Sequence, residues 1–409
     1  MLITAESKAH LAENVDTLLA ESTANYRINA VIAGATSDKE VLYLKAQGVR
    51  DVESKVPVET NDLIDFYSGT KIFTNMALMK LYEEGKVNLD IPARTYLPEI
   101  SKIELIDAGT VDKKTGRFTV PPRKPMHEVT VRHLALHTAG FCYFFFNSDY
   151  AALGKNIDPE IMYNEPNREY FSTPAMPLLH EPGKKWVYGV NTDWIGFIIE
   201  EITGMPLDEY VKKVIFDPIG MTSCTYRLKD MTNVLKVHQR KPDSSLELYP
   251  HKINSDPKLL RGGQGCYGSV SDLFKMFRVL LNDGYSPDSG LQIFEKETVQ
   301  YAIQNHIPTG IDVEIHGMTP SKDIPGYIPD GFTLTGNAYS KNNLPTGRPK
   351  GSIYWGGFAN LFHWIDFDNK IAGFWGTQVY PYNDMYCKSS AVKFEKMVYD
   401  NLKTGTPKL

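Results

Sequence analysis

The amino-acid sequence predicts an α+β fold, an α/β sandwich in which a sheet is assembled from both ends of the chain. Two strand patterns lie near the start of the 409 residues, and strand-like runs return only near the end. Between them, a long stretch is rich in helix patterns and poor in strand patterns. This order of elements predicts a helical domain inserted into a sheet domain.

Three elements are expected near the start of the chain. Residues 8–20 carry the apolar spacing of an amphipathic helix, and residues 28–35 and 40–46 form two strand-like runs. The short polar run at 36–38 separates the two strands as a turn. Because two paired strands need a larger sheet to be stable, we expect further strands later in the chain.

The middle of the chain has the pattern of helices joined by loops, and the end returns to strands. The expected helices cover residues 130–137, 192–203, 206–215 and 271–282, with Thr130 and Ser271 as N-caps and Gly204 between the second and the third. Strand-like runs follow at 351–366 and 370–379, and a helix at 388–401 closes the chain. We expect residues 1–88 and 258–409 to form a discontinuous sheet domain and residues 89–257 a mostly helical inserted domain.

The composition is that of a globular chain and disfavours nucleic-acid binding. The 44 Lys and Arg residues and the 49 Asp and Glu residues give a formal net charge of −5, and both signs are spread along the chain. This distribution leaves no basic stripe for a phosphate backbone. No apolar run reaches the length of about 18 residues that a membrane span needs. We therefore expect neither nucleic acid nor a membrane as a partner.

The N-terminus and the cysteines favour the cytoplasm. Residues 1–14 lack the basic start and apolar stretch of a secretory signal. The cysteines are scattered without a Cys-x-x-Cys pair, which favours reduced, buried thiols over disulfides. They are Cys142, Cys224, Cys266 and Cys387. The final Pro407-Lys408-Leu409 matches a peroxisomal Ser-Lys-Leu address at two of three positions, which makes the peroxisome the alternative location.

A Ser-x-x-Lys motif opens a strongly apolar helix pattern. In Ser68-Gly-Thr-Lys71 the hydroxyl and the amine are three residues apart, so they share one face of a helix. A neighbouring amine can take the proton of a serine hydroxyl, or as a cation lower the pKa of another base that does. The pair therefore predicts a nucleophilic serine, with a helix cap and a solvated lysine as the equal structural alternative. The apolar residues that predict a buried helix, ended by Gly85, are Ile72, Phe73, Met76, Ala77, Met79 and Leu81.

The sequence contains two more Ser-x-x-Lys patterns, and both are weaker. Pro257 lies between Ser255 and Lys258 and would interrupt the helix that brings the two side chains together. Ser390 belongs to the expected C-terminal amphipathic helix, where serine and lysine are ordinary surface residues. Ser68 is therefore the candidate nucleophile.

Two further motifs favour structural roles over cofactor chemistry. His133 and His137 have the spacing of a zinc-binding pair, but Leu134 stands where a His-Glu-x-x-His site needs its glutamate. We expect packing and loop-anchoring roles for both histidines. The segment 263–268 matches the dinucleotide fingerprint, but no clear strand precedes it, so a glycine-rich loop near a site is favoured. We expect neither a cofactor nor a metal.

Six aromatic residues are concentrated in the segment 141–150, among them Tyr143 and Phe145. Core packing is the usual explanation of such a run. The alternative is an apolar wall of a ligand pocket, because small-molecule sites are mostly lined by apolar and aromatic side chains.

Three segments in order make the chain resemble a known superfamily. They are Ser68-Gly-Thr-Lys71, Trp186-Val-Tyr188-Gly-Val-Asn191 and Tyr354-Trp355-Gly356-Gly357. Together they resemble the serine β-lactamase and penicillin-binding-protein superfamily. Within it the chain is most similar to the class-C-like esterases, the family VIII carboxylesterases, and to the acyltransferase of the lovastatin pathway. The resemblance implies an antiparallel sheet flanked by helices with an inserted all-helical domain.

The resemblance also implies a set of site residues. Ser68 would be the nucleophile, and Lys71 and Tyr188 would share the acid and base work, with a cationic Lys71 lowering the pKa of the Tyr188 phenol. The amides of Ser68 and Phe358 would form the oxyanion hole. The residues implied to bind substrate are Trp355, Gly356, Gly357, Asn191, Tyr143, Phe145 and Gln378.

Departures from the superfamily pattern favour esters as substrates. Trp355 stands where members that bind β-lactams carry a lysine, and Val190 stands where many members carry an asparagine. We expect a carboxylesterase that works through an acyl-serine intermediate on a small-molecule ester or acyl donor. The alternative is an acyltransferase or transesterase, with an alcohol of a secondary metabolite as acceptor or an acyl-carrier protein as a partner. A β-lactamase and a catalytically inactive binding protein are the weaker alternatives.

Overall fold

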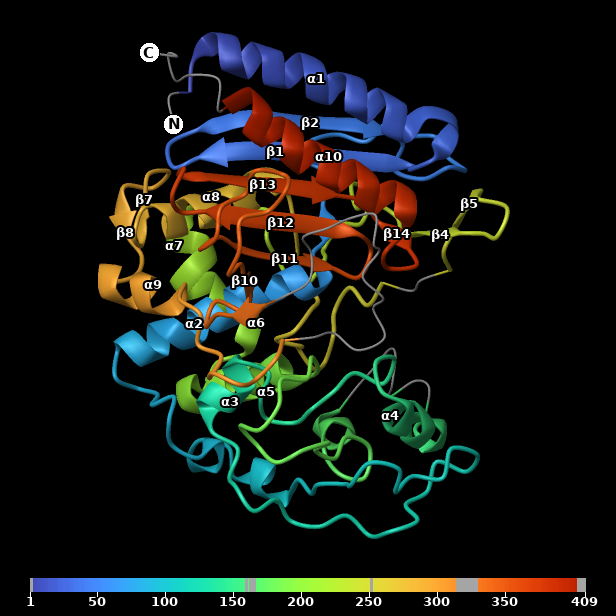
Figure 1. Ribbon diagram of the computed structural model, residues 1–409, viewed down its shortest axis with the longest axis vertical. Coiled ribbons are helices and arrows are strands. Elements are labelled where there is room, and N and C mark those ends of the chain that lie inside the picture. Colours follow the sequence, from blue (N-terminus) through green and yellow to red (C-terminus); the bar gives the residue numbers. More distant parts are fainter. Residues whose placement is uncertain (1–2, 159–160, 162–166, 251–252, 314–329, 403–409) are drawn as a thin grey trace.

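An antiparallel sheet forms the centre of the upper part of the molecule (Figure 1). The computed structural model describes residues 3–158, 161, 167–250, 253–313 and 330–402. Within these residues the main sheet has seven strands in the order β2-β1-β13-β12-β11-β10-β9. Their bounds are β2 (Val41–Gly48), β1 (Ala30–Ser37), β13 (Ile371–Gly376), β12 (Leu361–Asp366), β11 (Ile353–Gly357), β10 (Ala338–Tyr339) and β9 (Gly331–Phe332).

The two ends of the chain meet in the middle of this sheet. Strand β1 pairs with β13 in a register that runs from Ile32 opposite Gly376 to Ser37 opposite Ile371. Helices α1 (Ala5–Thr23) and α10 (Met385–Leu402) lie side by side over the same face of the sheet (Figure 1). The expectation of one sheet built from both chain ends is therefore confirmed.

Helices cover both faces of the sheet, and neighbouring side chains on one strand reach different helices. Trp375 packs against Phe394 of α10, with ring centroids 5.6 Å apart. The next residue along the strand, Phe374, packs on the other face against Phe66, at 6.4 Å. Helix α8 (Val270–Leu281) covers that second face. Burial on both faces explains why β1 is an almost unbroken apolar run.

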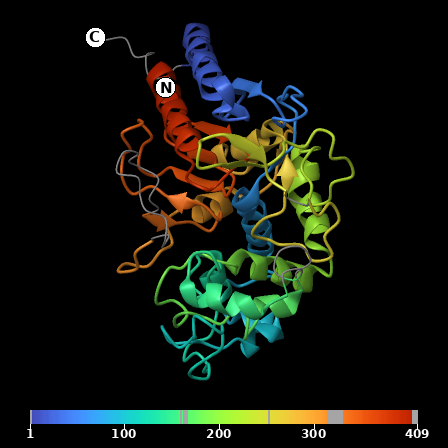
Figure 2. The ribbon, with the colours of Figure 1, turned by 90° about the vertical axis from the view of Figure 1, so that its right-hand side faces the viewer.

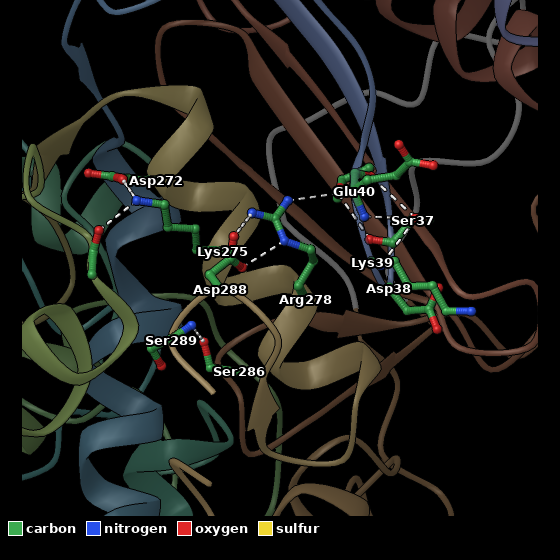
Figure 3. Close-up of polar contacts among 12 residues, drawn as sticks. Ser37, Asp38, Lys39, Glu40, Asp272, Lys275, Arg278, Ser286, Asp288 and Ser289 are labelled. Atoms are coloured by element: carbon green, nitrogen blue, oxygen red, sulfur yellow. Dashed lines mark hydrogen bonds and ion pairs between the residues drawn. The ribbon is translucent and has the colours of Figure 1, made fainter. Parts of the chain in front are cut away.

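Arg278 joins α8 to strand β1 by a hydrogen bond and to the loop that carries Asp288 by an ion pair (Figure 3). The Arg278 guanidinium bonds both carboxylate oxygens of Asp288, at 2.6 and 2.8 Å, and donates to the Thr36 hydroxyl at 2.9 Å. One turn earlier, Lys275 bonds Asp272 at 2.8 Å. The Arg278 side chain is only 5% exposed, so the pair holds a charge that water hardly reaches.

The lower part of the molecule consists of short helices joined by long loops, and α2 (Lys71–Glu83) lies between it and the sheet (Figures 1 and 2). The remaining helices are α3 (Val131–Ala135), α4 (Ser148–Leu153), α5 (Asn191–Thr203), α6 (Leu207–Val211), α7 (Asp217–Ile219) and α9 (Lys296–Ala302), with a π-helical turn η8 (Lys212–Phe216) between α6 and α7. Short 3₁₀ turns are η1 (Ala24–Tyr26), η2 (Tyr67–Thr70), η3 (Ala93–Thr95), η4 (Pro98–Lys102), η5 (Gly154–Asn156) and η7 (Arg168–Phe171).

Three small sheets complete the described structure. They are β14 (Val379–Tyr380) with β4 (His238–Arg240) and β5 (Leu246–Leu248), β3 (Ile64–Asp65) with β6 (Tyr267–Gly268), and β7 (Tyr285–Ser286) with β8 (Leu291–Gln292). Because β4 and β5 lie inside residues 89–257, the inserted segment is not all-helical as expected. Its residues near the sheet domain pair with β14, which follows the last long strand. The domain boundaries at residues 88 and 257 stay a prediction.

Most expected elements exist, although several of their boundaries differ. Gly85 ends α2 in the left-handed conformation with φ 69°, and Gly204 does the same for α5 with φ 64°. The N-cap of α8 is Ser269 rather than Ser271, since the Ser269 hydroxyl accepts the Asp272 amide. The run 351–366 contains two strands, because the chain turns at Asn360 with φ 61°.

Three further sequence expectations concern the cysteines, membrane spans and the C-terminal tripeptide. All four cysteines are buried and unpaired. Among the residues that the structure describes, no helix is long and apolar enough to cross a bilayer. The tripeptide 407–409, expected as a possible targeting signal, lies outside the described residues.

Candidate active site

Ser68 stands on the 3₁₀ turn η2, directly before α2. The preceding residue, Tyr67, has a left-handed backbone with φ 45°, which is uncommon for a bulky side chain. The Asp65 carboxylate accepts the Tyr67 amide at 2.8 Å, and the Phe66 carbonyl accepts the Gly69 amide at 2.7 Å. These bonds close the tight turn that places Ser68 immediately before the first turn of α2.

Lys71 begins α2 and is fully buried. Its amine lies 3.1 Å from the Ser68 hydroxyl, 3.3 Å from the Tyr143 hydroxyl and 2.8 Å from the Gly263 carbonyl oxygen. Burial lowers the pKa of Lys71 to about 7, and the charge of Asp193 partly opposes this change. A substantial fraction of Lys71 is therefore a neutral amine near neutral pH, able to accept a proton.

Tyr188 contacts the same serine from the helical part of the molecule. Its hydroxyl donates to the Ser68 hydroxyl oxygen at 2.6 Å, and the Lys71 amine lies 4.8 Å from the centre of its ring. Burial raises the pKa of the Tyr188 phenol, although hydrogen bonds to Ser68 and Trp355 favour its ionised form. The pKa of this phenol is therefore shifted upward, away from neutrality, because desolvation dominates. At neutral pH Tyr188 is a proton donor.

The C-terminal end of β11 packs directly on the turn that carries Ser68. A side chain at Gly357 would place its Cβ 2.7 Å from the Phe66 carbonyl oxygen, and one at Gly356 would meet the Leu361 oxygen at 2.3 Å. Both glycines are thus required by close backbone approach. Trp355 packs edge to face on Tyr188, with ring centroids 5.1 Å apart. Phe358 follows at the end of the strand, beside this contact.

Aromatic rings border the site on its solvent side. Tyr143 stacks on Phe145 with ring centroids 5.3 Å apart, and Phe145 contacts Phe358 at 5.2 Å. Phe145 is 45% exposed and Phe358 36% exposed, which is unusual for such side chains. We call Tyr143, Phe145 and Phe358 the aromatic collar. Its position next to Lys71 favours the ligand-wall interpretation of the segment 141–150 over core packing alone.

Two residues expected to bind substrate are instead buried within the protein. The Asn191 amide donates to His137 Nδ1 at 2.9 Å, and the Gln378 amide donates to the Asp65 carbonyl oxygen at 3.0 Å. Both side chains are completely buried. Each therefore fixes a segment that carries a site residue, because neither presents a polar atom to solvent from which a substrate could approach.

The glycine-rich loop and Asp193 belong to the site, and the sequence identified only the first. The Gly263 oxygen accepts the Lys71 amine, and the Gly263 amide donates to the Asp193 carboxylate at 3.3 Å. Asp193 is 2% exposed, and burial raises its pKa while Arg261 and Lys71 oppose this. An acidic residue in the buried first turn of a helix rich in apolar residues was the signal available. An acidic residue at this position also stabilises the N-terminus of a helix, so the sequence did not identify Asp193 as part of the site.

The remaining motif candidates lie elsewhere or have structural partners. His133 Nδ1 accepts the Thr130 amide at 3.2 Å, within the cap of α3. Among the described residues, no group of three or more His, Cys, Asp or Glu side chains is arranged to hold a metal ion. Ser390 is buried rather than on the surface, and bonds Ser22 of α1 at 2.9 Å, far from α2 in the sequence and the fold.

Known proteins resemble this chain along most of its length. The family model described as Beta-lactamase matches residues 15–387. The chain is 26% identical over 398 residues to the ML-236A carboxylate methylbutanoyltransferase mlcH of Penicillium citrinum, covering 91% of this chain and 90% of that protein. It is 26% identical over 378 residues to the lovastatin esterase of Penicillium rubens, covering 88% and 91%. One relative is thus named a transferase and the other an esterase.

The fold is shared with a solved enzyme. The unliganded simvastatin synthase LovD of Aspergillus terreus superposes with a TM-score of 0.82, covering 98% of this chain and 100% of that chain. The sequences are 21% identical in this comparison, so the likeness shows the fold alone. An antiparallel sheet with flanking helices is common to both.

Proposed function

The chain belongs to the beta-lactamase family, and we propose that within it the protein is a serine ester hydrolase in which Ser68 is the nucleophile. Relatives named esterases and acyltransferases make acyl transfer the chemistry of this branch. The observation that supports this assignment most directly is that the Ser68 hydroxyl oxygen has two polar partners. Ser68 Oγ lies 3.1 Å from the Lys71 amine and 2.6 Å from the Tyr188 hydroxyl.

In the acylation step, Lys71 is the base. The neutral amine takes the proton of Ser68, and the serine oxygen forms a bond to the ester carbonyl carbon. A buried lysine with a pKa of about 7 is matched to this task at neutral pH. The negative charge of the tetrahedral intermediate rests on the former carbonyl oxygen. The amides of Ser68 and Phe358 are proposed to donate to that oxygen, since β11 and η2 are in contact.

Tyr188 supplies the proton that the leaving alcohol needs. Burial keeps its phenol protonated, and its hydroxyl already points to the serine oxygen at 2.6 Å. When the carbon–oxygen bond of the ester breaks, the phenol gives its proton to the leaving oxygen. The Lys71 ammonium then returns a proton to Tyr188, so both groups regain their starting state. Water attacks the acyl-serine by the same steps in reverse order and releases the acid.

Acyl transfer to an alcohol is the second candidate function. It uses the same residues, with an alcohol in place of water in the second half of the reaction. The 26% identity to a methylbutanoyltransferase supports it, and so does the aromatic collar, which offers apolar rings to an apolar acceptor. A β-lactamase is a weaker candidate because Trp355 occupies the place of a lysine that would hold a substrate carboxylate.

The proposed partners are small molecules. An ester or other acyl donor acylates Ser68, and an alcohol accepts the acyl group in the transfer reaction. An acyl-carrier protein would be a donor by the same attack on a thioester carbonyl. The cytoplasm stays the predicted location.

The test measures nitrophenol release from p-nitrophenyl butyrate by the wild type, Ser68→Ala and Ser255→Ala. The Ser255 variant is the control, because it removes the serine of another Ser-x-x-Lys motif. We expect nitrophenol release and a mass increase of one butyryl group on the wild type and the Ser255 variant only. Equal background release from all three proteins, without an adduct on the wild type, would refute the proposal. Adding an alcohol then separates the two candidates, because hydrolysis yields the acid and transfer yields a new ester.

A further inference from the structure

His137 is a buried residue with an uncommon backbone. It follows α3 with φ 56°, in the left-handed region that only a few non-glycine residues adopt, and it is completely buried. Burial, together with the charge of Lys71, lowers the pKa of the imidazole well below its usual range. The ring is therefore neutral wherever the enzyme is folded and active.

Three hydrogen bonds join His137 to the segment that carries Tyr188. The Val187 amide donates to the His137 carbonyl oxygen at 2.9 Å. The Gly189 amide lies 3.4 Å from His137 Nδ1, and the Asn191 side-chain amide lies 2.9 Å from the same nitrogen. The residues on either side of Tyr188 are thus both anchored to His137.

The backbone donor determines the tautomer of the ring. A peptide N–H can only donate, so Nδ1 must accept from Gly189 and carries no proton itself. The proton of the neutral imidazole consequently resides on Nε2. Gly189 is required by a different contact, because a Cβ there would lie 2.4 Å from the Phe141 oxygen and from the Cys142 Cα. The imidazole at 137 and the close packing of Gly189 thus both fix the 187–191 segment.

The imidazole also packs on the phenol itself. Its centroid lies 4.9 Å from that of the Tyr188 ring, and Trp355 packs on the same ring with a centroid distance of 5.1 Å. These contacts leave the Tyr188 ring few orientations. The orientation that it adopts directs the hydroxyl to Ser68 at 2.6 Å.

We propose that His137 is a positioning residue that holds the Tyr188 hydroxyl where it can protonate the leaving alcohol. His137 is completely buried and contacts the 187–191 segment and the phenol ring, so it acts through them. The inference rests on the proposed ester chemistry. It gives a role in the reaction to a residue for which the sequence predicted only packing and loop anchoring.

This role has a consequence that a purely structural role lacks. A p-nitrophenolate group leaves as a stable anion and needs little help from an acid, whereas ethoxide must be protonated as it leaves. Misplacing Tyr188 should therefore slow the hydrolysis of an ethyl ester more than that of a p-nitrophenyl ester with the same acyl group. General loss of folded protein would reduce both rates by one factor.

The experiment measures kcat/KM for p-nitrophenyl butyrate and ethyl butyrate and compares their ratio among variants. His137→Gly removes the imidazole without a penalty at φ 56°. His137→Asn tolerates the same φ and keeps an acceptor near the position of Nδ1. Tyr188→Phe is the reference for complete loss of the proton donor. His133→Gly is the matched control, because His133 Nδ1 also accepts a backbone amide, at 3.2 Å, but in the cap of α3.

We expect the ratio of kcat/KM for p-nitrophenyl butyrate to kcat/KM for ethyl butyrate to increase by on the order of 10-fold or more in His137→Gly and in Tyr188→Phe. Loss of a general acid predicts this increase. The ratio should stay near the wild-type value in His137→Asn and His133→Gly, even where the melting temperature falls. A ratio unchanged in His137→Gly, or changed equally in His137→Asn and His137→Gly, would overturn the proposal. If His137→Gly does not fold, His137→Asn tests the proposal by itself, and an altered ratio in that variant would overturn the proposal.

A measurement on the wild type needs no variant. In protein labelled with ¹⁵N-histidine, the His137 imidazole, assigned through its backbone, should stay neutral with its proton on Nε2. A proton on Nδ1 would contradict the bond from Gly189 and overturn the proposal. Failure of the ester chemistry is recognised separately, because the wild type would then form no acyl adduct, and the positioning role would fall with it.

Discussion

Lys71 and Asp193 bind the same glycine from two sides. The Lys71 amine donates to the Gly263 carbonyl oxygen at 2.8 Å, and the Asp193 carboxylate accepts the Gly263 amide at 3.3 Å. Both side chains are buried, so their charges act on each other in a medium that screens them weakly. The loop fixes the distance between an acid and the proposed base without a direct bond between them.

Activity should increase with pH through the titration of Lys71. Its pKa is lowered to about 7 by burial, and only the neutral amine can accept the Ser68 proton. At low pH the ammonium form dominates, so kcat/KM should be small, rise with pH and level off above pH about 7. The measurement is a pH profile of kcat/KM with a p-nitrophenyl ester. A decrease over the same range would show that the cation is the active form, with Tyr188 as the base.

Asp193→Asn should shift the rising limb of that profile to lower pH. The Asp193 carboxylate favours the ammonium form and so raises the pKa of Lys71 against the effect of burial. Removing the negative charge lets this pKa fall further, and the neutral amine is then present at lower pH. Asparagine keeps an acceptor for the Gly263 amide. Glu200→Gln, a change of carboxylate on the same helix where Glu200 pairs with Arg168, should leave the limb in place. Equal shifts in both variants would mean that Asp193 has no specific effect.

Gly357→Ala should reduce turnover by about 100-fold, as small displacements of reacting groups do. The new Cβ would lie 2.7 Å from the Phe66 oxygen and push β11 away from the turn that carries Ser68. Gly34→Ala is a matched control, since its Cβ would meet the Tyr43 oxygen at the same 2.7 Å, at a position remote from the site. Both should lose about 1–3 kcal/mol of unfolding free energy. Comparable losses of kcat in the two variants would show that reduced stability of the whole protein, and not displacement of β11, lowers the activity.

Asp288→Ala should lower the unfolding free energy by about 3 kcal/mol, because it leaves the buried Arg278 charge without its partner (Figure 3). Urea denaturation measures the change. The exposed pair of Lys396 and Asp400, each side chain 56% exposed, provides the comparison. Asp400→Ala should cost less than about 0.5 kcal/mol. Equal costs would mean that burial does not set the strength of the first pair. The kcat of both variants should equal that of the wild type while they are folded.

Local signals in the sequence predicted the helices well and the strand ends less well. Gly85 and Gly204 end their helices because a left-handed residue is needed there, and glycine adopts that conformation freely. Ser269 and Ser271 are both acceptable N-caps, so the sequence alone could not choose between them. The turn that ends at Asn360 contains no proline, and its glycine, Gly357, stands at its first position, so the run 351–366 looked continuous.

The sequence predicted that Ser68, Lys71 and Tyr188 lie together, but it did not predict their protonation. The pairing of Ser68 with Lys71 follows from helix spacing, and Tyr188 followed from resemblance. The pKa of a group depends on how completely it is desolvated and which charges surround it. Those quantities arise from contacts between residues as distant in sequence as Lys71 and Asp193. For the same reason Asn191 and Gln378 looked like substrate contacts until their burial was known.

The pairing of β1 with β13 also dictates when a newly synthesised chain becomes an enzyme. Ser37 acquires its neighbour Ile371 only after most of the polypeptide has been translated. Until then the proposed nucleophile, Ser68, has left the ribosome without the strand that ends in Gly357 beside it. A nascent chain that stops before β11 therefore lacks the Phe358 amide of the proposed oxyanion hole.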